Sequence, residues 1–546
     1  MNEPKHIFSY IGESMKLNWD YPCFSDYGES TDYTFGQVAA QVEKLNLAYK
    51  AMGIEKGDKI AFCGANSAHW GISFISVLAY QAVAVSILPD FTGPDIEKLV
   101  NHSDAQVLLA GPVVAKKIDP KNLTHVKAVI NYMDFSVVYA KDKQIEKILL
   151  SMDALFDKAH PNGFSRDDIH YPLADLDDLA LINYTSGTTS TPKGVMLSYR
   201  SLSTNTQFGI EHIPHEPHDA IVSMLPLAHM FGMAFEFLYP FAEGNHIYFL
   251  PKMATPILLQ AFKDVHPYLL LTVPLVIEKI YRKKLRPVVK NWFVKMVWNW
   301  PIVGTAIKKK VRAGLMEAFG GKIFELIIGG AALSSEVEQC LKDIQFPFTV
   351  GYGMTECGPL ICYRVYKEFV PHSCGRIVDR MEMRIDSEDP KNIVGELQVR
   401  GAAVMQGYYK NEEATKGIFT ADGWLRTGDL GVMDDDGNIF IKGRSKNMIL
   451  GPSGQNIYPE EVEEIVNARG GIAESVVVSR DGKLVALVYP DFDYDRHGRT
   501  DEEQLAVWKQ RCNKYLPPYS QISAIEVVDK EFEKTPKKSI KRFLYS

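Results

Sequence analysis

The chain has 546 residues, which is too long for one hydrophobic core, so we expect more than one domain. Its 46% hydrophobic and 23% charged residues are typical of a globular protein. A formal net charge of -7 argues against a general nucleic-acid-binding protein.

The seven cysteines are spread thinly along the chain, and no two of them have CxxC spacing. This pattern argues against a disulfide framework and against a zinc site, and it favours a reducing compartment. The first residues contain no apolar segment behind a basic start, so we expect no secretory signal. The sequence therefore predicts a cytoplasmic protein.

The first part of the chain alternates helical periods with short apolar runs, which predicts α/β layers built on parallel strands. The uncharged run from Trp70 to Pro89 contains serines and a glutamine. It therefore predicts a buried helix followed by a buried strand, and not a membrane span. The predicted strands are residues 59–63, 82–88, 105–110, 179–184, 247–250 and 323–328.

Two smaller units are predicted after residue 375. Up to residue 443 the segments shorten and turn dipeptides such as Asp422-Gly423 recur, which predicts a compact, barrel-like β subdomain. After residue 446, a helix starting at Pro459 and a hairpin signal at Asp481-Gly482 predict a small α+β unit. We therefore expect a large N-terminal α/β domain over residues 1–443 and a small C-terminal domain over residues 444–546.

The segment after the predicted strand 179–184 is rich in groups that bind phosphate. Residues 185–195 include six hydroxyl side chains, two glycines and Lys193. Glycines allow backbone N–H groups to approach an anion closely, hydroxyls add donors, and the lysine adds positive charge. The segment lacks the Gly-Lys-Ser/Thr of a Walker loop. On composition alone, a flexible surface linker is the more ordinary interpretation.

The order of these residues changes that interpretation. Ser-Gly-Thr-Thr-x-x-Pro-Lys-Gly in residues 186–194 resembles the signature of the adenylate-forming superfamily of acyl-CoA synthetases, peptide-synthetase adenylation domains and luciferases. The resemblance covers nearly the whole chain, points to the long-chain fatty acyl-CoA synthetases, and departs at Ser190, where the family usually has glycine. It implies an N-terminal adenylation domain and a mobile C-terminal lid. The residues it assigns to the phosphates of ATP are Thr185, Ser186, Gly187, Thr188, Thr189 and Lys193.

Two further loops follow predicted strands at places where a nucleotide can bind. In parallel sheets, ligands lie outside the carboxyl ends of the strands, and small residues there leave room for a flat base. Tyr352 lies between two glycines and can stack on adenine, Thr355 can bond a phosphate oxygen, and Glu356 can hold Mg²⁺. A tight glycine turn with a core tyrosine is the alternative, but the segment through Glu356 resembles the family's adenine and metal loop. The residues assigned here are Gly330, Ala331, Gly351, Tyr352, Gly353, Thr355 and Glu356.

The resemblance supplies the remaining ATP, hinge and coenzyme A (CoA) residues. It implies that Asp429, in a Thr-Gly-Asp segment, binds the ribose diol and that Arg444 makes a second ribose or phosphate contact. Lys446 lies at the family's hinge position between the two domains, and a solvated surface lysine is the alternative. Ser453 and Gly454 belong to the segment that lines the pantetheine tunnel for CoA after domain rotation.

One histidine is assigned to the binding site of the carboxylic acid substrate. His229, within the segment 225–233, resembles a family position near the acyl carboxylate, and a hydrogen-bonded core histidine is the alternative. Peptide-synthetase domains usually place an aspartate just after this region to pair with an α-amine. The segment Phe231–Phe235 has no acid, which favours a substrate without an amine.

The C-terminal tail departs from the family. Aligned on Thr535 and Arg542, the usual catalytic lysine falls on Ser539. Either Lys538 or Lys541 substitutes for it, or adenylation is weakened. A one-residue shift in an extended segment turns a side chain to the opposite face, so substitution is not automatic. We assign the role to Lys538.

Together these features predict a ligase that adenylates a medium- or long-chain fatty acid with ATP and Mg²⁺, releases pyrophosphate and transfers the acyl group to CoA. Two alternatives stay open: an acyl carrier protein as the acceptor, and a catalytically weakened acyl- or nucleotide-binding homologue. Residues 281–312 hold ten Lys/Arg and no Asp/Glu among several aromatics, which can give reversible contact with the inner face of an anionic membrane. An ordinary basic surface helix is the alternative there.

Overall fold

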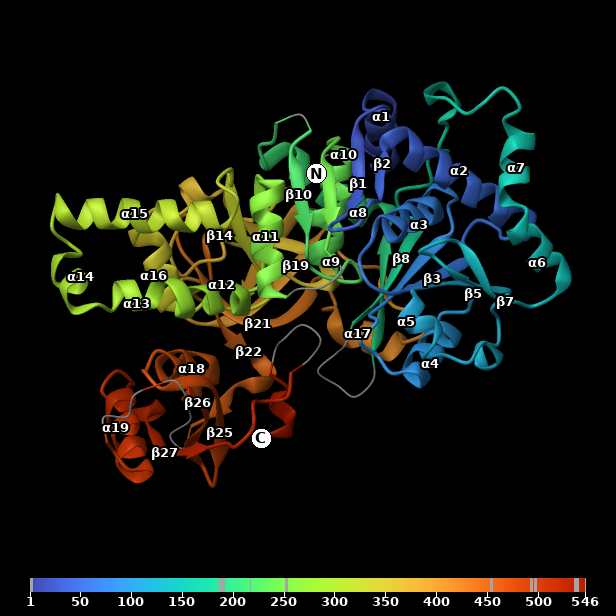
Figure 1. Cartoon of the computed structure of the whole chain (residues 1–546). Coiled ribbons are helices and arrows are strands. Elements are labelled where there is room, and N and C mark those ends of the chain that lie inside the picture. The colour runs from blue at the N-terminus through green and yellow to red at the C-terminus, as the bar shows by residue number, and fades with distance from the viewer. Residues whose placement is uncertain are drawn as a thin grey trace.

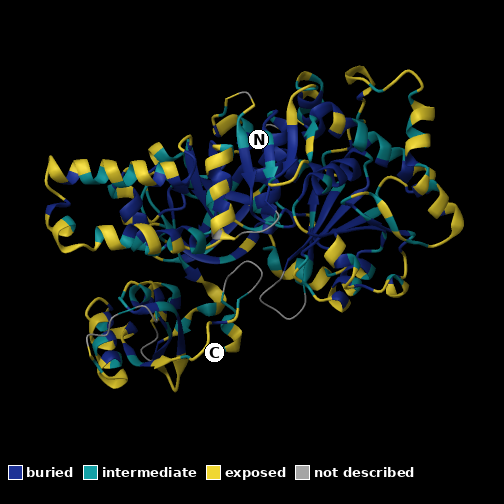
Figure 2. Ribbon diagram, in the orientation of Figure 1, coloured by how far each residue is buried: buried dark blue, intermediate teal, exposed yellow. Residues whose placement is uncertain are grey.

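The computed structural model describes residues 3–185, 192–216, 218–250, 254–451, 455–491, 494, 498–534 and 540–545. Figure 1 shows a broad body of sheets and helices, with a smaller lobe below it that contains the C-terminus. Most of the body's interior is buried, as the dark blue strands in Figure 2 indicate. Among the described residues, no helix combines the length and the apolarity that crossing a membrane requires.

The first large sheet has eight strands and is parallel at its centre. All of the strands predicted from apolar runs in this part of the chain are present, within one residue at each end. In sheet order the strands are β20 (Gly407–Tyr408), β9 (Lys193–Ser198), β8 (Leu179–Thr185), β4 (Val83–Ile87), β3 (Lys59–Cys63), β5 (Ala105–Ala110), β6 (Ala128–Asn131) and β7 (Ser136–Ala140).

The second large sheet has seven strands, and all of its pairs except β1 with β2 are parallel. It contains the predicted strands 247–250 and 323–328, displaced or shortened by one or two residues at an end. Its strands, in sheet order, are β14 (Phe348–Val350), β13 (Glu325–Ile328), β12 (Leu269–Thr272), β10 (Ala220–Ser223), β11 (His246–Phe249), β1 (Pro22–Asp26) and β2 (Asp32–Thr34).

Helix α3 (Ala68–Ala79) joins the cores of the two sheets. Its Trp70 ring lies 5.8 Å from the ring of Phe62 on β3 and 6.0 Å from that of Phe237, measured between centroids. The Phe237 ring in turn lies 5.8 Å from that of Phe24 on β1. Aromatic pairs at these separations add to the stabilisation from burial. The predicted buried helix and strand over residues 70–89 are therefore confirmed as α3 and β4.

The other helices of the body cover the sheet faces or connect the strands (Figure 1). They are α1 (Ile7–Leu17), α2 (Phe35–Ala51), α4 (Gly93–His102), α5 (Pro112–Ala115), α6 (Lys143–Leu150), α7 (Met152–Ala159), α8 (Tyr199–His212), α9 (Met230–Gly232), α10 (Tyr239–Ala242), α11 (Thr255–Val265), α12 (Pro274–Ile280), α13 (Arg286–Val289), α14 (Trp292–Val297), α15 (Val303–Ala318), α16 (Ser335–Asp343) and α17 (Glu412–Ile418).

The predicted change to short strands after residue 375 appears as an antiparallel sheet. Its order is β18 (Met381–Asp386), β19 (Gly395–Gly401), β21 (Leu425–Met433) and β22 (Ile439–Arg444). A turn at Asp436-Gly437 joins β21 to β22, and Gly437 adopts a φ of +79°, which a side chain would disfavour. A smaller antiparallel sheet of β15 (Tyr352–Gly353), β16 (Leu360–Tyr363) and β17 (Arg376–Ile377) precedes it.

The C-terminal lobe has its own hydrophobic clusters, separate from those of the body. Strands β25 (Ile472–Arg480) and β26 (Lys483–Pro490) form the predicted hairpin, with positive φ at both Asp481 and Gly482. Strand β27 (Ile522–Val527) lies parallel to β26, and helices α18 (Pro459–Asn467) and α19 (Asp501–Asn513) complete the lobe. The predicted α/β class, with a β unit and then a small α+β unit, is therefore confirmed.

One buried carboxyl group in the second sheet makes stability depend on pH. Glu325 on β13 is fully buried, and burial raises its pKa to about 7, although it accepts hydrogen bonds from the Tyr363 hydroxyl and the Tyr366 N–H. A carboxyl group with a raised pKa stabilises the fold fully below its unfolded pKa, and this contribution is lost as the pH rises through about 7.

We therefore expect Glu325→Gln to flatten this dependence. Between about pH 5 and about pH 8, wild type should lose about 3 kcal/mol more of its free energy of unfolding than the variant, since each pKa unit is worth about 1.4 kcal/mol. Urea unfolding of both proteins across that range measures the difference. Parallel profiles for the two proteins would show that Glu325 does not titrate there.

Candidate functional site

Three loops predicted to contribute to one site converge at the carboxyl ends of β13 and β14. Gly329 is at the centre of this arrangement, because a methyl group added there would lie 3.2 Å from the Phe231 ring and 3.6 Å from the Gly351 carbonyl oxygen. Gly330 follows with a φ of +86°, a conformation that favours glycine. The Phe231 ring and the Gly351 carbonyl oxygen therefore both lie close to Gly329, so residues 329–331, residue 351 and the 225–233 segment lie together.

Beside them, Tyr352, Asp429 and Arg444 form a hydrogen-bonded cluster. The Tyr352 hydroxyl donates to Asp429 Oδ2 at 2.7 Å, and Arg444 Nε lies 2.8 Å from Asp429 Oδ1. Asp429 and Arg444 are opposite each other on β21 and β22, and Asp429 is buried. Burial and the Asp429 carboxylate hold the pKa of Tyr352 well above its usual range. Residues that the sequence singled out in three separate motifs thus lie within hydrogen-bond reach of one another.

A second cluster joins the phosphate-loop segment to Glu356. The Tyr408 hydroxyl donates to Glu356 Oε1 at 2.8 Å, and Lys193 Nζ lies 4.8 Å from the centroid of the Tyr408 ring. Burial first, and then the Glu356 carboxylate, raise the pKa of Tyr408. The two-residue strand β20 pairs with β9, and the Met405 N–H donates to the Glu356 carbonyl. The sequence did not identify Tyr408, because its position depends on this long-range strand pairing.

The predicted phosphate loop begins and ends at one place. Thr185 and Lys193 are paired across β8 and β9, so the chain leaves and returns beside the Lys193, Tyr408 and Glu356 side chains. Thr355, which begins a 3₁₀ turn before Glu356, is buried. The predicted residues that lie outside the described part of the chain are Ser186, Gly187, Thr188, Thr189, Ser453, Gly454, Lys538 and Ser539.

Lys446 lies in a 3₁₀ turn that directly follows β22. Its pKa is lowered to about 8, first by desolvation and then by the positive charges of Arg444 and Lys193. The nearby Asn447 amide donates to Glu460 Oε1 on α18 at 2.6 Å, which connects this turn to the C-terminal lobe. The predicted hinge lysine is therefore electrostatically coupled to both clusters of the candidate site.

The acid-side segment is fixed between the two large sheets. Asn183 on β8 donates from Nδ2 to the Ala228 carbonyl at 2.9 Å, which places His229 next to the end of that strand. After His229 the chain forms α9 and then a π-helical turn over Met233–Leu238. Such turns often mark functional sites.

Glu236 lies one residue beyond the acid-free segment Phe231–Phe235 and is fully buried in this π-helical turn. Its Oε2 accepts hydrogen bonds from the backbone N–H groups of Met224 and Leu225 at 2.9 and 2.8 Å. Burial raises its pKa well above the usual range, so the group favours its neutral form. Glu236 therefore supports the 224–229 segment, a role that needs the π-helical geometry and that helical periodicity does not reveal.

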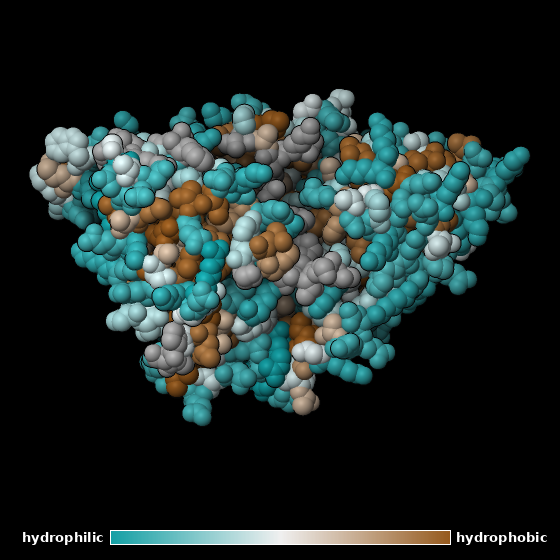
Figure 3. Space-filling view, turned by 90° about the horizontal axis from the view of Figure 1, so that it is seen from below, coloured by the Kyte–Doolittle hydropathy of each residue, from teal (hydrophilic) through white to brown (hydrophobic). Residues whose placement is uncertain are grey.

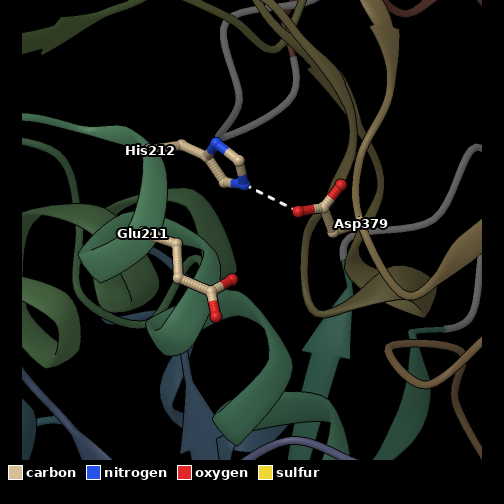
Figure 4. Close-up of side chains that lie close together, drawn as sticks. All are labelled: Glu211, His212 and Asp379. Carbon is tan, nitrogen blue, oxygen red and sulfur yellow. Dashed lines mark hydrogen bonds and ion pairs between the residues drawn. The ribbon is translucent and has the colours of Figure 1, made fainter. Parts of the chain in front are cut away.

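Among the described residues, the only group of three side chains with metal-ligand spacing is Glu211, His212 and Asp379 (Figure 4). All three are exposed. The Glu211 carboxylate forms a two-bond ion pair with Arg380 at 2.7 and 2.9 Å, and His212 Nε2 lies 2.7 Å from Asp379 Oδ2. Because these ligand atoms already have protein partners, the group is best explained as a surface ion-pair network.

Comparisons with known proteins agree with this arrangement. The family model described as AMP-binding enzyme matches residues 13–409. The chain is 27% identical to 4-coumarate–CoA ligase 2 of Petroselinum crispum, covering 96% of this chain and 91% of that protein. It is 28% identical to fatty acyl-CoA synthetase A of Dictyostelium discoideum, covering 85% of this chain and 73% of that protein.

A solved structure shares the fold. The ATP-bound crystal structure of MatB from Rhodopseudomonas palustris aligns with a TM-score of 0.76 and 20% identity, over 99% of this chain and 98% of that chain. The family model spans well over half of the chain, and the matched residues include both ends of the phosphate loop as well as Tyr352, Glu356 and His229. The chain therefore belongs to the AMP-binding enzyme family, the adenylate-forming enzymes that its sequence motifs resemble.

Proposed function

We propose that this protein is an ATP-dependent acid–thiol ligase that adenylates a medium- or long-chain fatty acid, releases pyrophosphate and transfers the acyl group to CoA. The observation that carries the proposal is that the short segment 352–356 joins two clusters, Tyr352 with Asp429 and Arg444, and Glu356 with Tyr408 and Lys193. The relatives named as CoA ligases for fatty acids and 4-coumarate support an acid as the substrate and CoA as the acceptor.

In this proposal the two clusters bind different parts of ATP. Tyr352 stacks on adenine beside the small residues Gly330, Ala331, Gly351 and Gly353, which leave room for a flat ring. Asp429 accepts hydrogen bonds from the ribose diol, since each carboxylate oxygen has lone pairs beyond those used by Tyr352 and Arg444. The hydroxyl and glycine residues 185–189, with Lys193 and Thr355, bind the phosphates.

Glu356 fits a Mg²⁺ ligand. Its carboxylate is half-buried, one oxygen accepts a bond from the neutral Tyr408 hydroxyl, and no described lysine or arginine forms an ion pair with it. Mg²⁺ is usually bound by one or two protein carboxylates together with substrate phosphates, and it then supplies charge neutralisation at phosphate oxygens.

In the proposed reaction the protein acts by positioning the reactants and by stabilising charge electrostatically. The substrate carboxylate attacks the α-phosphorus of ATP, pyrophosphate leaves, and a mixed anhydride with AMP forms. No general base is needed, because the attacking group is already ionised. Lys193 and Thr355 stabilise the charge that spreads over the phosphoryl oxygens, and His229 lies near the carboxylate. The thiol of CoA then attacks the acyl carbon, and AMP leaves.

The fatty acid assignment rests on the environment of the acid-side segment. Met230, Met233 and Phe235 around His229 are buried and apolar, and the one nearby acid, Glu236, is fully buried, with its Oε2 accepting from two backbone N–H groups. An α-amine would therefore find no accessible carboxylate among these residues. We also propose that the domain boundary lies between residues 443 and 444, with Lys446 as the hinge and residues 453–454 lining the CoA tunnel.

The experiment that tests this proposal is pyrophosphate release over a panel of acids. The panel contains saturated fatty acids from eight to eighteen carbons and 4-coumarate, each assayed with and without CoA. We expect the highest kcat/KM with the longer fatty acids, and free acyl-CoA as the product. Efficient loading of an acyl carrier protein in place of CoA would contradict CoA as the acceptor. A preference for 4-coumarate would contradict a fatty acid as the substrate.

The tail gives a separate prediction. Lys538→Ala is expected to slow fatty-acid-dependent pyrophosphate release by about a hundredfold, since removing one donor to a developing charge costs roughly that much. Ser539→Lys is expected to give no gain. Lys541→Ala tests the other candidate lysine, and we expect it to have little effect, because the ammonium group of Lys541 lies 3.4 Å from Glu533. A large gain in Ser539→Lys, with an unaffected Lys538→Ala, would mean that the tail of the natural protein is impaired.

A further inference from the structure

A helical hairpin projects from the end of the body opposite α6 and α7 (Figure 1). It starts with α12, which follows β12, continues through a π-helical turn (Tyr281–Leu285) and α13, turns at α14, and returns along α15. The tip around α14 is largely exposed (Figure 2). At the matching end of Figure 3, pale and tan side chains interrupt a mostly hydrophilic surface. Pale residues have intermediate hydropathy, as tryptophan does.

Large apolar side chains point outward at this tip. Ile302 is 83% exposed, Trp292 75% and Trp300 54%. Exposed hydrophobic residues occur singly on most proteins, but a local group of them marks an interaction surface. The outward-facing apolar residues of the hairpin are Val288, Trp292, Phe293, Met296, Trp300, Ile302 and Val303.

The tip is held in this orientation by inward contacts. Trp298 is buried, and its Nε1 donates to Asp343 Oδ2 on α16 at 2.8 Å. Asn291 caps α14 by accepting from the Phe293 N–H at 3.1 Å. A methyl group at Gly304 would lie 2.3 Å from the Trp298 carbonyl oxygen, so the close turn into α15 requires glycine. These contacts give the tip a defined fold, and within that fold Trp292 and Trp300 are exposed.

Positive charge surrounds the apolar tip. The segment 281–312 contains ten Lys/Arg and no acidic residue. Of these ten basic residues, only Arg286 and Lys290 form an ion pair with a described acidic residue, and both pair with Glu336. Arg282 donates to the Ala473 carbonyl. The basic residues of the segment without a described ion pair are Arg282, Lys283, Lys284, Lys295, Lys308, Lys309, Lys310 and Arg312.

We propose that this tip docks on the surface of an anionic lipid bilayer. Tryptophan is enriched at the membrane–water interface, and exposed apolar residues among lysines insert into the headgroup region while the lysines contact anionic lipids. The uncompensated positive charge favours this partner over a second copy of the chain, because the same segment of that copy would repel it.

The base of the hairpin lies next to the candidate site. Val273, the residue after β12, has its Cγ1 3.7 Å from the position of a methyl group on Gly330. If the proposed function holds, docking would bring a substrate that partitions into membranes close to the acid side of that site. Membrane docking itself does not rest on the proposed function, and its test uses neither ATP nor a fatty acid.

The test is co-sedimentation of the full chain with vesicles of equimolar phosphatidylcholine and phosphatidylglycerol. We expect binding to these vesicles, much weaker binding to phosphatidylcholine alone, and loss of binding with added salt. The charge variant Lys295→Glu/Lys309→Glu/Lys310→Glu should weaken it at least about a hundredfold, since each basic residue near such a surface contributes roughly a fivefold change. The tip variant Trp292→Ser/Trp300→Ser should weaken it at least about tenfold.

Matched controls separate docking from general surface effects. Lys143→Glu/Lys147→Glu/Lys158→Glu changes the same number of charges on α6 and α7, at the other end of the molecule, and should leave binding unchanged. Leu17→Ser/Leu150→Ser removes two exposed apolar residues elsewhere. All variants should keep the wild-type circular dichroism spectrum.

Two results would overturn the proposal. One is equal binding to charged and neutral vesicles, or binding that the charge and tip variants leave intact. The other is sedimentation velocity showing a dimer that the tip variant dissociates, with no vesicle binding, which would make a second copy the occupant. Quenching of wild-type tryptophan fluorescence by brominated lipid, reduced in the tip variant, is the expected supporting result.

Discussion

Glu356→Gln is expected to lower fatty-acid-dependent pyrophosphate release by about a thousandfold, which corresponds to roughly 4 kcal/mol of transition-state stabilisation. The amide oxygen of glutamine can still accept the bond from Tyr408, so the local structure is retained while the negative charge is lost. We expect the Mg²⁺ concentration needed for half-maximal rate to rise as well. Initial rates measured across a Mg²⁺ titration provide both values.

Tyr408→Phe is the matched control for this prediction. It removes only the hydroxyl donor to Glu356 Oε1 and keeps the ring beside Lys193. Its rate should fall by about tenfold to a hundredfold, clearly less than in Glu356→Gln, because a hydrogen bond to a charged group contributes roughly 1.5 to 3 kcal/mol. A Glu356→Gln variant that retains more than about a tenth of the wild-type rate, with an unchanged Mg²⁺ requirement, would remove Glu356 from the proposed metal site.

Asp429→Asn is expected to raise the KM for ATP by about a hundredfold. Hydrogen bonds from hydroxyls to a carboxylate contribute roughly 1.5 to 3 kcal/mol each, and the amide replaces at least one of them with a weaker bond. The specific measurement is the ratio of kcat/KM for ATP to that for 2′-deoxy-ATP. Wild type should discriminate against the deoxynucleotide, and the variant should lose most of that discrimination.

Glu382→Gln is a suitable comparison, because Glu382 lies in the same four-stranded sheet and pairs with an exposed arginine, Arg400. It should leave the KM for ATP unchanged. If Asp429→Asn retained the full preference for ATP over 2′-deoxy-ATP, then Asp429 would act only through Tyr352 and Arg444.

Buried strands were the most predictable part of the fold. Each of the apolar runs at 59–63, 105–110 and 179–184 became a buried strand of the first sheet that is parallel to at least one neighbour, because such strands are covered on both faces and so contain few polar residues. The hairpin at Asp481-Gly482 was equally clear, since a turn with two positive φ values needs this kind of dipeptide.

The candidate site was predictable where a motif directly follows a strand, as at Gly351–Glu356 and Thr185. It was not predictable where a side chain depends on long-range pairing. Tyr408 reaches Glu356 only because β20 pairs with β9, and a two-residue strand has no periodicity to detect. Glu236 is similar, because its burial results from a π-helical turn, whose register differs from that of an α-helix.

We propose that the Lys193 cluster and the Tyr352 cluster bind one and the same nucleotide. Calorimetric titration with α,β-methylene-ATP, which cannot be cleaved at the reacting bond, tests it directly on wild type, Lys193→Ala, Tyr352→Ala and the surface control Lys147→Ala. We expect one site per chain, with affinity reduced at least about tenfold by either cluster variant and unchanged in the control. No nucleotide uptake by wild type, or a loss of affinity in only one of the two cluster variants, would contradict it.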